Sequence, residues 1–148
     1  MIVGTGMKGT LGAMVKGIAS GYYFHIKGNE ARRSVIHAYD VARAVRLIAP
    51  VGGIYNLADR VHPTVRNLAE AIAHRLGDRR IYTISPRLLN FAARIGDKIS
   101  FIPFSSEHLQ RLTSTLTVDS SAISEVIDWQ PRDVVNFLLT HQYDENDL

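Results

Sequence analysis

The sequence contains no cysteine, which excludes disulfide bonds, thiolate nucleophiles, thiolate zinc sites and cysteine-bound iron–sulfur clusters. This absence favours a reducing compartment, so we expect a cytoplasmic protein. No apolar run approaches the roughly 20 residues that a membrane span needs, and glycines and lysines interrupt the first twenty residues, where a signal peptide would be apolar. We therefore expect neither a membrane span nor a secretion signal.

Charge of one sign is also scarce, since 17 basic and 14 acidic residues leave a formal net charge of +3. That excess is too small to require a nucleic-acid partner, and none is expected. Thirteen of the basic residues are arginine, whose guanidinium group binds phosphate in a bidentate manner. The arginine excess thus favours a phosphate-bearing ligand or reflects a compositional bias.

With 46% apolar residues and only five prolines, the 148 residues can bury one sizeable core. We expect a single domain over residues 1–148, with a loose acidic tail at 144–148. Apolar spacing predicts an α/β alternation of elements. The predicted helices are 10–20, 41–48, 64–76, a helix from Pro86 to Gly96, 106–113, 120–127 and a turn or helix from Pro131. The predicted strands are a very short one at 1–3 and longer ones at 22–27, 53–57 and 81–84. Asp40 is expected to cap the helix at 41–48, and Ser120 or Asp119 the helix at 120–127.

Gly4, Gly6 and Gly9 match the Gly-x-Gly-x-x-Gly fingerprint of dinucleotide-binding proteins and lead into a predicted helix. Glu30 stands about where a ribose-binding acid is expected. Against this interpretation, only three residues precede the glycines, so the strand that should place the turn is very short. A small dinucleotide-binding protein remains one alternative.

Tyr23 and Lys27 match the Tyr-x-x-x-Lys pair of short-chain dehydrogenases, in which the lysine lowers the pKa of the phenol. Residues four apart are neighbours, at about 6 Å, only on a helix. In the strand predicted here they are roughly 13 Å apart, which excludes that coupling. No His-Glu-x-x-His, Gly-x-Ser-x-Gly or P-loop motif occurs, and the six histidines are scattered. We identify no catalytic residue and no metal site.

Four further segments, spread over nearly the whole chain, resemble sequence segments of a known family and follow one another in the same order. Residues 32–44, Arg-Arg-Ser-Val-Ile-His-Ala-Tyr-Asp-Val-Ala-Arg-Ala, resemble the R-(D/S)-x-(I/V)-H-V-x-D-(V/L)-A-x-A segment of extended short-chain dehydrogenases, the nucleotide-sugar epimerases and dehydratases. Residues 2–11 look like the family's V-Y-G-P-G-x-K-x-N run, and 53–69 look like its G-x-Y-N segment. Residues 112–131 resemble the close of the sugar 4-epimerase branch. Thr5 departs from the family's proline, and Asp128 from its glycine.

The resemblance implies which part of such an enzyme this chain forms. The family places its NAD-binding glycines and its Tyr-x-x-x-Lys pair N-terminal to all four segments. The chain then corresponds to the C-terminal substrate-binding region with the last strands of the Rossmann sheet, α+β when taken alone. NAD would belong to the complete enzyme, a UDP-sugar 4-epimerase-like isomerase, and neither a cofactor nor a cofactor-binding residue is expected here. The other interpretation is a non-catalytic nucleotide-sugar-binding or interaction module.

The resemblance also implies substrate-binding residues. The family pairs an arginine at the position of Arg33 with the diphosphate of the nucleotide sugar, and a second arginine stands at Arg111. Thr10 and Leu11 occupy the family's N-(L/F), with threonine in place of asparagine. The strand bordering the base corresponds to His25, Ile26 and Lys27. His37 is expected to be a buried polar group that ties elements together.

A chain of this kind should also self-associate. The helices 10–20 and 41–48 each carry an apolar stripe, and one of these faces would be exposed without the cofactor domain. Unpaired edges on the strands containing Ile2 and Ile54 would add to this tendency.

Overall fold

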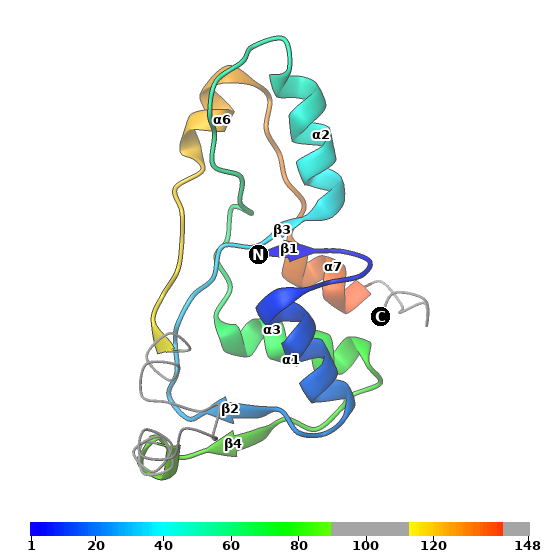
Figure 1. The fold of residues 1–148 in the computed structure, drawn as a ribbon, viewed down its shortest axis with the longest axis vertical. Coiled ribbons are helices and arrows are strands. Elements are labelled where there is room, and N and C mark those ends of the chain that lie inside the picture. Colours follow the sequence, from blue (N-terminus) through cyan, green and yellow to red (C-terminus); the bar gives the residue numbers. More distant parts are fainter. Residues whose placement is uncertain (90–112, 141–148) are drawn as a thin grey trace.

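The computed structural model describes residues 1–89 and 113–140 of the chain (Figure 1). In chain order the elements are β1 (Ile2–Val3), α1 (Gly9–Ala19), β2 (Phe24–Ile26), β3 (Ile36–His37), α2 (Ala38–Ile48), α3 (Val65–Arg75), β4 (Tyr82–Ile84), α6 (Ser121–Val126) and α7 (Val134–Thr140). Strands and helices are mixed and the strands pair in parallel, which confirms the α/β prediction. Residues 86–89 are helical, but the rest of the helix predicted from Pro86 and nearly all of the one at 106–113 lie outside the described residues.

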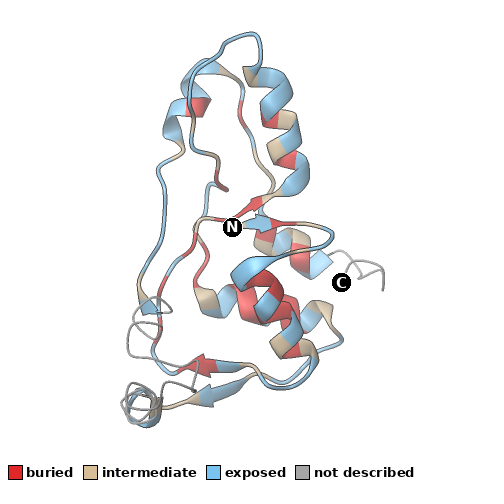
Figure 2. Cartoon of the chain, viewed as in Figure 1, coloured by how far each residue is buried: buried red, intermediate tan, exposed pale blue. Residues whose placement is uncertain are grey.

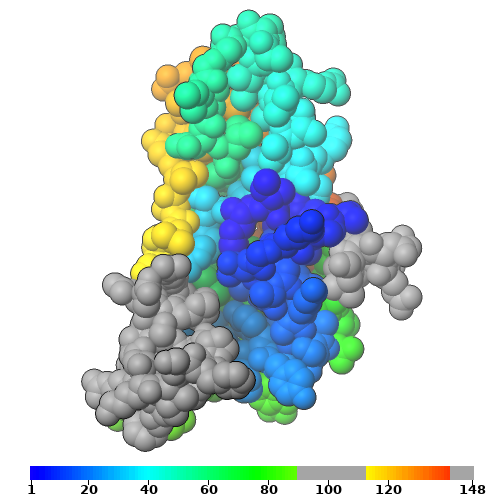
Figure 3. Space-filling view, in the orientation of Figure 1, coloured from blue at the N-terminus to red at the C-terminus, as the bar shows by residue number. Residues whose placement is uncertain are grey.

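The strands form two separate parallel pairs. β1 pairs with β3, with Ile2 opposite Ile36, and β2 pairs with β4, with Phe24 opposite Tyr82. Between the pairs, the chain at 31–34 runs alongside two distant segments (Figure 3). The backbone N–H of Arg33 donates to the carbonyl of Pro63 at 3.0 Å, and that of Leu116 donates to the carbonyl of Arg32 at 2.9 Å. This link fixes segment 114–118 beside residues 31–34.

A first hydrophobic core joins β1, α1, α3 and α7, as Figure 2 shows. It consists of Val3, Leu11, Met14, Val15, Ile18, Val35, Leu68, Ala69, Ala71, Ile72, Ala73, Val134 and Leu138. The apolar residues of α1 recur at helical spacing, as the sequence predicted. α3 begins with a capping box, in which the Thr64 hydroxyl accepts from the backbone N–H of Asn67 at 3.0 Å.

A second, smaller core lies between α2 and α6, at the top of Figure 1. Its fully buried members are Ile36, Ala44, Ile123 and Trp129. The Arg43 guanidinium lies 5.2 Å from the centre of the Trp129 ring. Around this core several large apolar side chains face solvent, among them Val45, Val51 and Ile54.

The predicted roles of Asp40 and His37 are both wrong. α2 begins at Ala38 and its N-cap is His37, whose Nδ1 accepts from the backbone N–H of Tyr39 at 3.2 Å. Asp40 is buried inside the first turn, where it contacts the Arg132 guanidinium at 3.0 Å. A distant arginine therefore decides which of two neighbouring polar residues caps the helix and which one ties elements together.

The strand predicted at 53–57 is also wrong for this chain. These residues pair with no strand that the structure describes, and Ile54 is fully exposed. An extended segment becomes a strand only where a neighbour takes up its backbone N–H and C=O groups. In α6, the helix predicted at 120–127, Ser120 is the N-cap residue without a side-chain cap bond, while the Oδ1 of Asp119 accepts from the backbone N–H of Ser121 at 2.9 Å. None of the helices described is long and apolar enough to cross a membrane.

Candidate functional site

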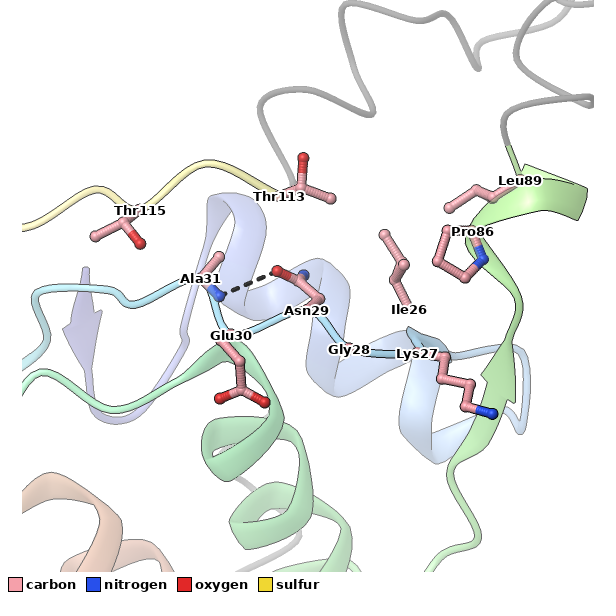
Figure 4. Close-up of a pocket in the computed structure, with 10 residues that line it drawn as sticks. All are labelled: Ile26, Lys27, Gly28, Asn29, Glu30, Ala31, Pro86, Leu89, Thr113 and Thr115. Carbon is pink, nitrogen blue, oxygen red and sulfur yellow. Dashed lines mark hydrogen bonds between the residues drawn. The ribbon is translucent and has the colours of Figure 1, made fainter.

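A cavity of about 490 Å³ opens beyond the carboxyl ends of the parallel strands β2 and β4 (Figure 4). This end of a parallel sheet is where α/β proteins commonly bind ligands, and the volume is within the range of small-molecule sites. Three segments line it, namely the turn after β2, the start of the helix after β4, and residues 113–115. The lining residues are Ile26, Lys27, Gly28, Asn29, Glu30, Ala31, Pro86, Leu89, Thr113 and Thr115.

The lining combines an apolar side with a polar one. Ile26, Pro86 and Leu89 lie together, as Figure 4 shows, and two threonines come from the other segment. Between them the turn is held by Asn29, whose Oδ1 accepts from the backbone N–H of Ala31 at 3.1 Å. A cavity with an apolar wall and a few fixed polar groups suits a flat ring system that also carries hydrogen-bonding atoms.

Arg33 lies next to this cavity but does not line it. Only 7% of the residue is exposed, and its Nη1 donates to the carbonyl oxygens of Arg32, at 3.0 Å, and of Ser114. Burial lowers the pKa of Arg33, although a guanidinium keeps its charge at neutral pH. The structure thus holds a buried cation against the segment whose Thr113 and Thr115 form the cavity wall.

The three consecutive residues predicted to border the base are divided between two cavities. Ile26 and Lys27 line the large cavity, and Figure 4 shows the Lys27 amino group extending away from the apolar wall. His25 is buried and lines a second cavity of about 70 Å³ against α3. β2 ends at Ile26 and Lys27 begins the turn after it, so the three consecutive residues do not form one surface.

The remaining predicted residues lie elsewhere. Leu11 is buried in the first core and Thr10 is exposed at the start of α1, and neither lines the cavity. Arg111 lies outside the described residues. The sequence prediction missed the turn at 28–31 and residues 86–89. Its own strands at 22–27 and 81–84 would have pointed there, had they been paired in parallel, because the segments following their carboxyl ends would then meet.

Among the described strands, the pairing around Gly4, Gly6 and Gly9 differs from that of a dinucleotide-binding fingerprint. In that fingerprint the strand after the first helix joins the same sheet as the first strand. Here β2 follows α1 but pairs with β4, whereas β1 pairs with β3. Glu30, the proposed ribose acid, lines the cavity beyond β2 instead.

The strand predicted at 22–27 is found in shortened form as β2, so Tyr23 precedes the strand and Lys27 belongs to the turn that follows it. Burial raises the pKa of Tyr23 to about 12, the opposite of what a catalytic phenol needs. Among the described residues no group of three or more His, Asp or Glu side chains could hold a metal ion.

No family model matches the sequence, and no curated protein matches it at a significant level. Solved structures do match. UDP-N-acetylglucosamine 4-epimerase from Bacillus cereus aligns with a TM-score of 0.61 at 14% identity, over 93% of this chain and 40% of its own. For dTDP-glucose 4,6-dehydratase from Bacillus anthracis, solved with NAD, the TM-score is 0.60 at 14% identity, over 94% of this chain and 40% of its own.

UDP-glucose 4-epimerase from Thermotoga maritima, solved with UDP-glucose, aligns with a TM-score of 0.57 at 17% identity, over 93% of this chain and 41% of its own. The chain therefore spans about two fifths of the length of the structures it matches. At these identities the likeness concerns the fold, and it agrees with the resemblance found in the sequence. The chain has the fold of part of an extended short-chain dehydrogenase, as found in nucleotide-sugar epimerases and dehydratases.

Proposed function

We propose that this chain is the nucleotide-sugar-binding part of an NAD-dependent nucleotide-sugar epimerase, and that its ligand is a UDP-sugar. The observation that carries the proposal is the cavity of about 490 Å³ at the carboxyl ends of β2 and β4, with a buried arginine beside its wall. In this proposal the apolar wall and the two threonines hold the base, and Arg33 supplies charge to the diphosphate. NAD and the reacting tyrosine and lysine belong to the part of the enzyme that these 148 residues do not provide.

The chemistry of the cavity supports a binding role. Epimerisation by NAD needs a hydride acceptor and a proton-transfer group close to the sugar carbon. The side chains that line the cavity include no hydride acceptor, and their polar groups are two hydroxyls, one amide, one lysine and one carboxylate. What the cavity can contribute is orientation of the sugar, together with binding energy from groups remote from the reacting carbon, which are held alike in the ground and transition states.

Arg33 can act on a diphosphate directly or through the wall of the cavity. Its Nη1 now holds the carbonyl of Ser114, so a phosphate that reached the guanidinium would compete for that donor. In the second case Arg33 is a positioning residue that fixes segment 113–115. The direct role requires the positive charge of Arg33, whereas the positioning role requires its shape and hydrogen bonds. Substitutions of Arg33 separate the two roles.

Binding to the 148-residue chain tests the proposal by calorimetry or NMR titration, with uridine, UDP and UDP-N-acetylglucosamine as ligands. We expect all three to bind, with UDP tighter than uridine because of the diphosphate. Arg33→Gln should weaken UDP by about thirtyfold, the equivalent of about 2 kcal/mol for a charge-assisted contact, and leave uridine unchanged. Arg33→Lys should retain part of the UDP affinity.

Equal weakening of uridine and UDP by Arg33→Gln would assign Arg33 to positioning, and failure of all three ligands to bind would reject the proposal. The remaining alternatives have their own readouts. Turnover of a UDP-hexose by this chain with NAD would show that it is an enzyme by itself. Micromolar NAD binding that Gly6→Val abolishes would restore the dinucleotide interpretation.

A further inference from the structure

The second cavity places a histidine beneath the wall of the large one. It is lined by His25 of β2, by Arg66, Ala69 and Glu70 of α3, by Ile81, which precedes β4, and by Thr83 of β4. His25 is only 3% exposed, and its Nδ1 has no hydrogen-bond partner among the described residues. The predicted base-binding role does not account for this residue, because it points away from the large cavity.

The charges around His25 oppose one another. Arg66 and Glu70 belong to α3, and Glu30 belongs to the turn after β2, whereas β4 contributes only uncharged residues. Burial lowers the pKa of His25, and Arg66 lowers it further, while Glu70 and Glu30 raise it. At neutral pH the imidazole is therefore uncharged, and the Arg66 Nε contacts the Glu70 Oε1 at 2.7 Å.

Breaking the Arg66–Glu70 ion pair should cost little free energy. Both side chains are about half exposed and stand one turn apart on α3, where such pairs contribute little to stability. A protonated His25 repels Arg66 and attracts Glu70. The cavity of about 70 Å³ also has room for several water molecules, which would solvate the new charge.

A shift of His25 would be transmitted to the large cavity through the backbone of the residues that follow it. Ile26 and Lys27 follow His25 directly and line that cavity. β2 is three residues long and is paired, within the part described, with β4 alone, so little holds it against a small shift. We propose that His25, Glu70 and Arg66 form a proton-dependent switch beneath the large cavity, in which protonated His25 takes Glu70 from Arg66 and shifts the residues lining that cavity.

NMR titration of the chain between pH 4.5 and 8 tests the switch without any ligand. We expect the His25 ring to titrate below the usual midpoint of about 6.5, and the backbone amides of Ile26 and Lys27 to move with the same midpoint. Glu70→Gln should lower that midpoint and Arg66→Gln should raise it. Both substitutions lie on the exposed side of α3, which makes them a matched pair.

Two results would overturn the switch. One is that the amide shifts of Ile26 and Lys27 do not change with the titration of His25. The other is that the His25 midpoint moves in the same direction in both α3 variants. His25→Gln, which stays neutral at every pH, should abolish the amide shifts. If that variant does not fold, the two α3 variants still decide the matter.

A second experiment connects the switch to ligand binding, and this part rests on the proposed function. UDP-N-acetylglucosamine is a suitable probe because each of its phosphates carries one ester bond and the shared anhydride bond and so keeps a constant single negative charge. One added positive charge roughly 10 Å away should tighten binding about threefold from pH 7.5 to pH 5. His25→Gln should bind equally at both values.

If His25→Gln showed the same pH dependence of ligand binding as the wild-type chain, protonation of His25 would not control ligand binding. Absence of binding at every pH would reject the proposed function alone, because the titration of Ile26 and Lys27 needs no ligand.

Discussion

The two hydrophobic cores differ in size and in how completely they are covered. The first buries thirteen residues among β1, α1, α3, α7 and the extended chain next to them, whereas the second buries four between α2, α6 and their neighbours. In Figure 2 the buried residues concentrate in α1 and α3, and α2 is mostly exposed. The exposed apolar side of α2 is therefore available for contacts that the described residues do not make.

The difference predicts which of the two cores contributes more to stability. α1 and α3 carry apolar residues at helical spacing and find their partners within the described chain. α2 buries only Asp40 and Ala44 completely, although Val41, Val45 and Ile48 continue its apolar spacing. In the first core the apolar spacing of the helices therefore agrees with the residues that are buried. In the second core the two disagree, and three experiments test this contrast.

The largest effect is expected from truncating the first core. Leu68→Ala removes a fully buried side chain from α3 and should lower the free energy of unfolding by about 3 kcal/mol. Ile123→Ala in the second core should cost roughly half as much, because a small core with exposed neighbours can collapse into the space. Chemical denaturation gives both values, and hydrogen exchange should show the Ile123→Ala loss confined to α2 and α6.

Equal losses for Leu68→Ala and Ile123→Ala would contradict the contrast between the cores. A single cooperative transition in both variants would support the expectation that residues 1–148 form one domain.

Substitutions at two glycines of α1 test how closely this helix packs against the loop that precedes it. A Cβ built on Gly12 would lie 2.4 Å from the backbone oxygen of Met7, whereas at Gly17 the nearest atom is 3.5 Å away. Gly12→Ala should therefore cost about 2 kcal/mol through the shift it forces on the backbone. Gly17→Ala should stabilise the chain by about 0.5–1 kcal/mol, since alanine restricts the unfolded state and favours helix. Thermal unfolding of the two variants should move in opposite directions, and a stable Gly12→Ala would show that the loop is not seated against α1.

The sequence predicted well wherever an element's own pattern decides its structure. Thr64 with Asn67, and the spacing of Leu11, Val15 and Ile18, determined α3 and α1. The failures depend on distant partners: Asp40 is buried against Arg132, and residues 53–57 pair with no strand within the described part of the chain.

The site shows the same division. Ile26 and Lys27 could be predicted from the resemblance to the family, and both line the cavity. The placement of His25 on the other side, and the contact of Arg33 with Ser114, depend on how β2 meets α3 and how segment 113–116 returns to residues 32–34. No local pattern encodes that return.

The last expected effect concerns contact between copies of the chain. Val45 is 61% exposed and Ile54 fully exposed, and both adjoin the second core. Burying such side chains against a second copy is favourable, so we expect the wild-type chain to self-associate at high concentration. The double variant Val45→Asp with Ile54→Asp should weaken this association about tenfold, equivalent to about 1.4 kcal/mol.

Tyr22→Asp is the matched control for that experiment, since Tyr22 is 80% exposed but stands between α1 and β2, beside the first core. It should leave the association unchanged, because the apolar surface that drives it surrounds α2. Light scattering over a concentration series measures the association, and a hydrophobic dye reports the exposed surface. A wild-type chain that stays monomeric and binds no dye would show that the exposed side of α2 is tolerated in solution, and the contrast between the cores would then concern their size alone.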